Sequence, residues 1–252
     1  MGVGMIVRLV CVGSVLSRSR VFDYSLNPYV GCGFGCVYCY ARFMRRFSGH
    51  REPWGEFVDV KVNAPVVLRR EAVVRRRGLV WVSAVCDPYQ PVEARYRVTR
   101  RCLEILFGGG WPVYIQTKSD LVLRDVDLFR RYRGQVEVTV TITTGDDDIR
   151  RIFEPRAPGI DRRIEVLRRL HKMGIKTNLM IAPILPGADK LIPMVDGIVD
   201  EVLIDRLNYH YADHIYRRYG LEEAMTNEFF IRMKSRLASL LDERGIPYKI
   251  LF

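Results

Sequence analysis

The chain lacks the features that would place it in a membrane or send it out of the cell. No apolar run in its 252 residues reaches the roughly 18 residues needed to span a bilayer. The apolar opening at residues 2–16 contains Arg8 and is followed by Arg18 and Arg20. A cleavable signal peptide carries its positive charge before its apolar stretch, so this segment is instead predicted to be an N-terminal strand. We therefore expect a cytoplasmic protein without membrane contacts, in which cysteine thiols stay reduced.

Acidic residues are scarce relative to basic ones. The chain has 40 Lys and Arg against 29 Asp and Glu, which gives a net charge of +11. Arginine matches phosphate geometry, so the excess favours a phosphate-rich partner such as a nucleic acid. The alternative is an arginine-rich composition solvated on helix faces, and the scatter of the runs along the chain favours that alternative. Those runs are residues 69–70, 75–77, 100–101, 130–131 and 162–163.

Internal repeats, low-complexity tracts and linkers are also missing, which predicts one domain over residues 1–252. Strand-like runs alternate with helical stretches along the chain, and such repeats indicate parallel strands with outer helices. About six strand–helix units are counted, so the predicted fold is α/β, a partial (β/α)6 version of the TIM-type barrel. Its core is expected at about 20–206, with a C-terminal helix and strand at 221–252. In such a barrel the loops after the strands carry function.

Three cysteines, Cys32, Cys36 and Cys39, lie within eight residues on a glycine-rich loop in the pattern C-x3-C-x2-C. Three thiolates can hold three irons of a [4Fe–4S] cluster and leave the fourth iron open, whereas electron-transfer clusters use four cysteines. A zinc knuckle of three cysteines and His50 is the alternative. The trio predicts chemistry at an open iron.

Polar residues follow the predicted second and third strands. Asp87 and Glu93 lie in a loop stiffened by two prolines, where a carboxylate can accept hydrogen bonds from an ammonium group. The alternative is a turn in which Glu93 sits in the first turn of a helix. Lys118, directly after the strand at 113–117, is placed to contact a carboxylate or ribose.

Further candidate residues follow the fourth and fifth predicted strands, at the end of the barrel where the loops after the strands lie. Thr141 is expected to face inward with its neighbours two residues away. Arg163 is predicted to clamp a carboxylate or phosphate, or else to pair with Glu154 or Glu165. Ala182 lies at an apolar strand end against which an adenine would pack.

The cysteine pattern with Tyr38 before its last member resembles the radical S-adenosylmethionine (SAM) enzymes. Five further motifs over roughly residues 24–206 resemble the spore photoproduct lyase-like branch, often labelled "DNA repair photolyase". They are Asn-Pro-Tyr at 27–29, Asp-Pro-Tyr-Gln-Pro-x-Glu at 87–93, Thr-Lys-Ser at 117–119, Glu-Pro-Arg-Ala-Pro at 154–158 and Ala-Pro-Ile-Leu-Pro-Gly at 182–187.

The resemblance implies a [4Fe–4S] cluster on the three cysteines, with SAM chelating its open iron. Tyr38 and the backbone of Tyr40 would lie beside the adenine, Lys118 matches a SAM-contacting lysine, and Thr141 stands where the lyase has a serine. An external electron donor of ferredoxin or flavodoxin type would reduce the cluster. SAM would then be cleaved to a 5′-deoxyadenosyl radical that abstracts hydrogen from a substrate.

One departure concerns the hydrogen-donating cysteine that the lyase carries after its second strand. Ala84 falls near that place, and Cys86 is the candidate for a related catalytic role or is a small buried thiol. Tyr209, which follows the sixth strand, is a second candidate for hydrogen transfer; packing or a substrate-contacting rim are its alternatives. The substrate is predicted to be a nucleic acid lesion or base, with a small molecule or peptide as the alternative. A zinc-bearing, basic nucleic-acid-binding module is the non-enzymatic reading, and the sequence leaves the oligomeric state undefined.

Overall fold

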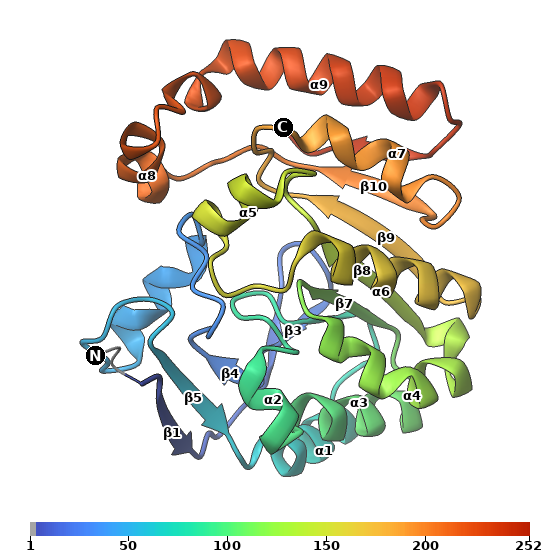
Figure 1. Ribbon diagram of the computed structural model, residues 1–252. Coiled ribbons are helices and arrows are strands. Elements are labelled where there is room, and N and C mark those ends of the chain that lie inside the picture. Colours follow the sequence, from blue (N-terminus) through green and yellow to red (C-terminus); the bar gives the residue numbers. More distant parts are fainter. Residues whose placement is uncertain (1–3) are drawn as a thin grey trace. The chain divides into compact units, whose positions relative to one another are not determined.

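The computed structural model of the chain describes residues 4–252 (Figure 1). These residues form two compact units, and each is described by itself. The first unit comprises the described residues up to Gly35 together with Ala41–Val138. The second comprises Cys36–Tyr40 and Thr139–Phe252. The single domain over 1–252 stays a prediction, and its residues 1–3 lie outside the described part.

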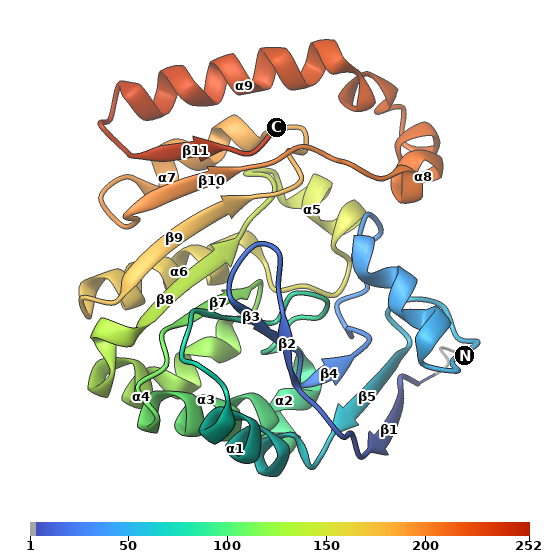
Figure 2. The same ribbon diagram turned by 180° about the vertical axis from the view of Figure 1, so that it is seen from behind.

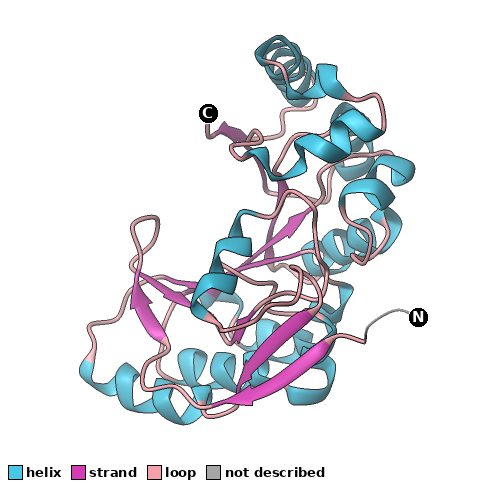
Figure 3. Ribbon diagram, turned by 90° about the vertical axis from the view of Figure 1, so that its left-hand side faces the viewer, coloured by secondary structure: helices cyan, strands magenta, loops and turns pink. Residues whose placement is uncertain are grey.

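The first unit contains two sets of strands. β1 (Ile6–Val10) and β4 (Tyr29–Val30) flank β5 (Phe57–Lys61), with β1 parallel to β5, as Figure 3 shows next to the N-terminus. The other set has the order β7-β6-β3-β2, in which β3, β6 and β7 run parallel and β2 is antiparallel. The bounds are β2 Leu16–Arg18, β3 Tyr24–Leu26, β6 Val80–Val82 and β7 Val113–Thr117.

Helices of the first unit follow its strands. α1 packs beside α3 in Figure 1, and a 3₁₀ helix at Tyr40–Phe47 begins directly after the cysteine loop. Arg97 has a left-handed backbone (φ 51°) and separates α2 from α3. The bounds are α1 Ala64–Val74, α2 Pro91–Tyr96, α3 Val98–Gly108 and α4 Val126–Arg131.

The second unit has the strand order β8-β9-β10-β11, in which β9, β10 and β11 run parallel. β8 (Val136–Thr141) begins in the first unit, and α9 packs against β11 and α7 (Figure 2). The other strands are β9 Lys176–Ile181, β10 Glu201–Ile204 and β11 Tyr248–Ile250. The helices are α5 Asp147–Phe153, α6 Ile160–Lys172, α7 Ile192–Val195, α8 Asp213–Arg218 and α9 Asn227–Asp242.

Helix α6 shows why the sequence folds this way locally. Its apolar residues Ile160, Ile164 and Leu167 recur at helical spacing and are buried, while the opposite face carries charged residues. Gly174 (φ 69°) then adopts the left-handed conformation that turns the chain into β9.

The prediction of an α/β fold with parallel strands and outer helices is confirmed, and neither unit closes into a barrel over residues 4–252. The described part of the opening segment contains the predicted N-terminal strand as β1, which pairs with β5; β3 and β4 precede the cysteine loop. None of the helices in the described residues combines the length and the apolar character needed to cross a membrane.

Candidate functional site

The cysteine loop leaves β4 and curls through two tight turns. The Gly35 N–H donates to the Cys32 carbonyl and the Cys39 N–H donates to the Cys36 carbonyl, both at 3.2 Å. None of the three cysteines forms a disulfide with a described residue; Cys32 and Cys36 are buried and Cys39 is half-buried. A side chain is excluded at Gly31, where an added Cβ would lie 2.3 Å from the Phe57 carbonyl oxygen. The loop path therefore depends on glycine at this position.

The start of the loop is held by Gln90, a fully buried residue of the first unit. Its amide Nε2 donates to the Gly31 carbonyl at 3.1 Å, and its Oε1 accepts from the Gly33 N–H at 2.8 Å. One side chain thus satisfies a donor and an acceptor of the loop. Sequence reasoning named Asp87 and Glu93 in the same motif and missed Gln90.

The end of the loop is held by a buried polar cluster of the second unit. The Val37 N–H donates to the Phe153 carbonyl at 3.0 Å, and the Tyr38 hydroxyl donates to Glu154. Glu154 also accepts from Thr143 at 3.1 Å. Burial, followed by the charge of Glu154, holds the pKa of Tyr38 well above its ordinary value, so the phenol stays neutral and donates.

Arg163 is the cation of this cluster. It lies 2.6 Å from the Glu154 carboxylate, both side chains are fully buried, and it donates to the carbonyls of Thr141 (3.1 Å) and Pro158 (2.8 Å). Burial lowers its pKa, but Glu154 outweighs that effect and the net pKa is raised. Of the two predicted roles, the pairing with Glu154 is the one observed. The predicted clamp for a carboxylate or phosphate stays a prediction.

Asp87 and Lys118 come together in the first unit, as their strand-end positions predicted. The Asp87 carboxylate accepts from the Thr117 hydroxyl and the Lys118 N–H, both at 2.7 Å, and from the Tyr89 N–H at 2.9 Å. Burial raises the pKa of Asp87 in spite of these bonds. The carboxylate therefore fixes the backbone of the Thr117–Lys118 segment, with the Lys118 side chain half-buried.

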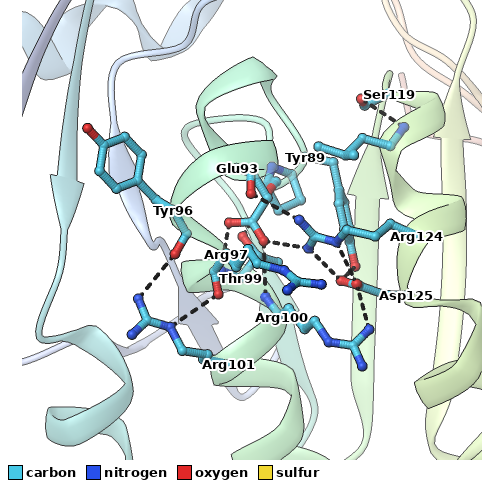
Figure 4. Close-up of polar contacts among 12 residues, drawn as sticks. Tyr89, Glu93, Tyr96, Arg97, Thr99, Arg100, Arg101, Ser119, Arg124 and Asp125 are labelled. Carbon is cyan, nitrogen blue, oxygen red and sulfur yellow. Dashed lines mark hydrogen bonds and ion pairs between the residues drawn. The ribbon is translucent and has the colours of Figure 1, made fainter.

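Glu93 lies at the centre of the network in Figure 4 and is fully buried. It accepts from the Tyr29 hydroxyl, from Arg124 at 2.6 Å and from the N–H groups of Thr99 and Arg100 at the start of α3. Glu93 lies in the first turn of α2, which confirms the first-turn alternative, and its carboxylate also stabilises the N-terminus of α3 after the break at Arg97. The predicted contact of Glu93 with an ammonium group stays a prediction.

Two further predicted residues lie at strand ends of the second unit. Thr141 is buried at the end of β8, where both faces of the strand are covered, since Val140 and Ile142 are as inaccessible as the threonines. Ala182 is half-buried directly after β9, and its peptide bond to Pro183 is cis. Their predicted contacts with the cofactor stay predictions.

Three tyrosines of the second unit form a stack. The rings of Tyr40 and Tyr209 are 6.0 Å apart and nearly parallel (20°), and those of Tyr209 and Tyr211 are 5.8 Å apart at 7°. Tyr209 is 48% and Tyr211 36% exposed. The stack, which includes Tyr40 directly after Cys39, therefore presents aromatic surface. Sequence reasoning singled out Tyr40 and Tyr209 separately; their contact joins residues 169 positions apart and has no local signal.

Cys86 is half-buried after β6. Burial raises the pKa of its thiol to about 11, so it is protonated at neutral pH. Its catalytic role stays a prediction.

His50 is unsuited to the predicted zinc knuckle. Its Nδ1 lies 2.8 Å from Glu52 and its Nε2 2.9 Å from Asp59, so both ring nitrogens are engaged. Across residues 4–252, no three His, Cys, Asp or Glu side chains are grouped as a site for a single metal ion. A cubane differs from a single ion because each thiolate binds a different iron.

The donor set suits such a cluster. Thiolates are the protein ligands of iron–sulfur clusters, and three of them leave one iron for a further ligand. The Arg163 Nη2 is buried and, within the described residues, has no hydrogen-bond partner. The charge of Cys36 is among the causes that raise the pKa of Arg163, which indicates a spare donor and a positive charge near this cysteine.

A parallel-strand α/β fold that carries three reduced cysteines on one glycine-rich loop is typical of a class of proteins that bind an iron–sulfur cluster. Residues 26–190 match the family model described as "Radical SAM superfamily". The chain belongs to this superfamily, and membership implies a [4Fe–4S] cluster and SAM as cofactors.

The comparisons with individual proteins are consistent with this membership. An uncharacterized protein of Methanocaldococcus jannaschii is 37% identical over 65% of this chain and 61% of its own length. A "Radical SAM Nalpha-GlyT isomerase" of Pseudomonas phage M6 is 26% identical over 64% of this chain and 33% of its own. The chain thus spans about three fifths or less of these curated relatives.

Among solved structures, a variant of spore photoproduct lyase with bound AdoMet and dinucleoside spore photoproduct has a similar fold. The TM-score is 0.71 at 15% identity, covering 98% of this chain and 82% of that one. At this identity the likeness concerns the fold alone.

Proposed function

We propose that this radical SAM enzyme acts on a base or lesion of a nucleic acid. The observation that carries the proposal is the stack of Tyr40, Tyr209 and Tyr211, which offers exposed aromatic faces beside the cysteine loop. Aromatic side chains stack on nucleobases with about 1–3 kcal/mol per base. The net charge of +11 favours a polyanionic substrate. The dinucleoside bound by the structurally similar lyase supports the same substrate class.

The cofactor, when bound and reduced, supplies a 5′-deoxyadenosyl radical that abstracts hydrogen. In our proposal Cys32, Cys36 and Cys39 hold the cluster, and the backbone of Tyr40, Lys118, Thr141 and Ala182 line the SAM site. Gln90 and the cluster of Tyr38, Glu154 and Arg163 hold the two ends of the loop and so fix the thiol positions. Cluster reduction requires an external electron donor, for which we propose the ferredoxin or flavodoxin type. Reduced thiols and a reducing donor favour the cytoplasm as the location.

Hydrogen transfer provides the test. The reconstituted enzyme is incubated anaerobically with SAM, dithionite and fully deuterated DNA, RNA or peptide in separate reactions, and 5′-deoxyadenosine is analysed by mass spectrometry. We expect deuterium in the 5′-deoxyadenosine with a deuterated nucleic acid and none with peptide. Deuterium transfer from peptide alone would replace the proposal with the peptide alternative.

A further inference from the structure

A groove on the first unit gathers arginines that are far apart in the sequence. It has a volume of about 730 Å³ and is formed by α1, the segment after α1, α3 and the turn after α3. Four arginines from three of the basic runs line it, namely Arg69, Arg75, Arg77 and Arg101. Three of the five runs that look scattered in the sequence therefore contribute to one groove.

The arginines of this groove have few acidic partners. Arg75 lies 3.4 Å from Glu71, and Arg101 donates to the carbonyls of Tyr96 and Arg97 (Figure 4). Within residues 4–252, no carboxylate lies within ion-pair distance of Arg69 or Arg77, and both side chains are exposed. Glu104, the one carboxylate in the lining, is paired with Arg100 at 3.2 Å.

The positive charge exceeds what the fold needs here. Four arginines against Glu104 leave a formal charge of +3 in the lining. The C-terminal ends of α1 and α3 contribute about half a negative charge each, which lowers this by about one unit. An excess of about two positive charges is left for a ligand.

Glycine residues leave part of the groove lining without side chains. Gly108 and Gly109 line it at the end of α3, and a Cβ added at the next residue, Gly110, would lie 3.6 Å from Arg77 Nη1. Backbone and guanidinium groups are therefore accessible to a ligand without obstruction by side chains.

We propose that this groove binds the phosphodiester backbone of a nucleic acid. Exposed guanidinium groups form paired hydrogen bonds with phosphate oxygens, and an open groove suits a polymer. Such contacts position the polymer without reading its sequence. The choice of polyanion rests on the proposed function, but the groove is tested by binding, without SAM cleavage, so that the two proposals fail separately.

The test measures binding of a fluorescein-labelled 20-base-pair DNA duplex to the cluster-loaded protein, by anaerobic fluorescence anisotropy between 50 and 300 mM KCl. Each phosphate contact is worth about 0.9 decade of affinity at 0.1 M salt, so Arg69→Ala with Arg77→Ala is expected to weaken binding about 60-fold and to reduce the salt slope by about 1.8. The variant Arg69→Lys with Arg77→Lys, which keeps the charge, is expected to retain most of the affinity.

The matched control is Arg130→Ala with Arg133→Ala, which removes the same charge from the same unit outside the groove. It is expected to change affinity less than threefold. Equal losses for the groove and control variants would overturn the proposal in favour of diffuse attraction. We also test whether 10 mM inorganic phosphate displaces the duplex. Displacement by phosphate, but not by chloride of equal ionic strength, would overturn the proposal in favour of a small-anion site.

Discussion

Replacing Glu154 by glutamine removes the negative charge from the buried pair with Arg163. Both side chains are fully buried, so the guanidinium would be left uncompensated, which typically costs about 3–5 kcal/mol. Against a domain stability of about 5–15 kcal/mol, this is a large fraction. With a slope of about 2 kcal/mol per M urea, the unfolding midpoint should fall by about 1.5–2.5 M.

The assay is urea unfolding of the apoprotein, followed by far-UV circular dichroism. Tryptophan fluorescence would report on the first unit, which contains all three tryptophans, whereas Glu154 and Arg163 lie in the second unit. The matched control is Glu165→Gln, on the same helix (α6) as Arg163. Glu165 pairs with Arg168 at 2.6 Å, but both side chains are about half exposed, so we expect a loss below about 1 kcal/mol. Equal losses for the two variants would refute the view that the Glu154–Arg163 pair holds the end of the cysteine loop.

Three further outcomes are expected. Iodoacetamide at pH 8 should label the exposed Cys11 well before Cys86, whose pKa of about 11 keeps it a thiol. Equal labelling rates of the two cysteines, measured by peptide mass spectrometry, would contradict this. Because the folded pKa of Cys86 is raised, its contribution to stability should be complete below about pH 9 and disappear as the pH rises through 11. Arg100 lowers the pKa of Asp127 to about 2, so its NMR titration should have its midpoint near 2, and the contribution of the pair to stability should be lost only as the pH falls from about 3.8 through 2. Finally, if Tyr209 stacks on a base, Tyr209→Phe should keep nucleic acid binding and Tyr209→Ala should weaken it. If Tyr209 instead transfers hydrogen, Tyr209→Phe should cleave SAM but form no product.

Local patterns allowed part of the site to be predicted from the sequence. The cysteine spacing requires no tertiary information, and the contact between Asp87 and the Lys118 backbone follows from adjacent parallel strands, whose carboxyl ends meet. The predicted strand at 113–117 coincides with β7.

Other parts depend on packing that a sequence does not display. A carboxylate in a proline-stiffened loop suits a ligand site and a buried helix cap equally well, and only the break at Arg97 brings the start of α3 to Glu93. Tyr38 and Glu154 are 116 residues apart, so no spacing rule connects them. Gln90 was missed because its amide side chain is uncharged, so the sequence gives no sign that it contacts the loop.

The central claim is that the cysteines at 32, 36 and 39 make this chain a radical SAM enzyme. The most direct measurement is 5′-deoxyadenosine formation by the anaerobically reconstituted protein with dithionite and SAM, quantified by liquid chromatography with mass spectrometry. The account predicts about four irons per chain, absorbance near 400 nm and 5′-deoxyadenosine, all lost when the three cysteines are replaced by alanine. A fully loaded protein that forms no 5′-deoxyadenosine above the level of the alanine variant would contradict it.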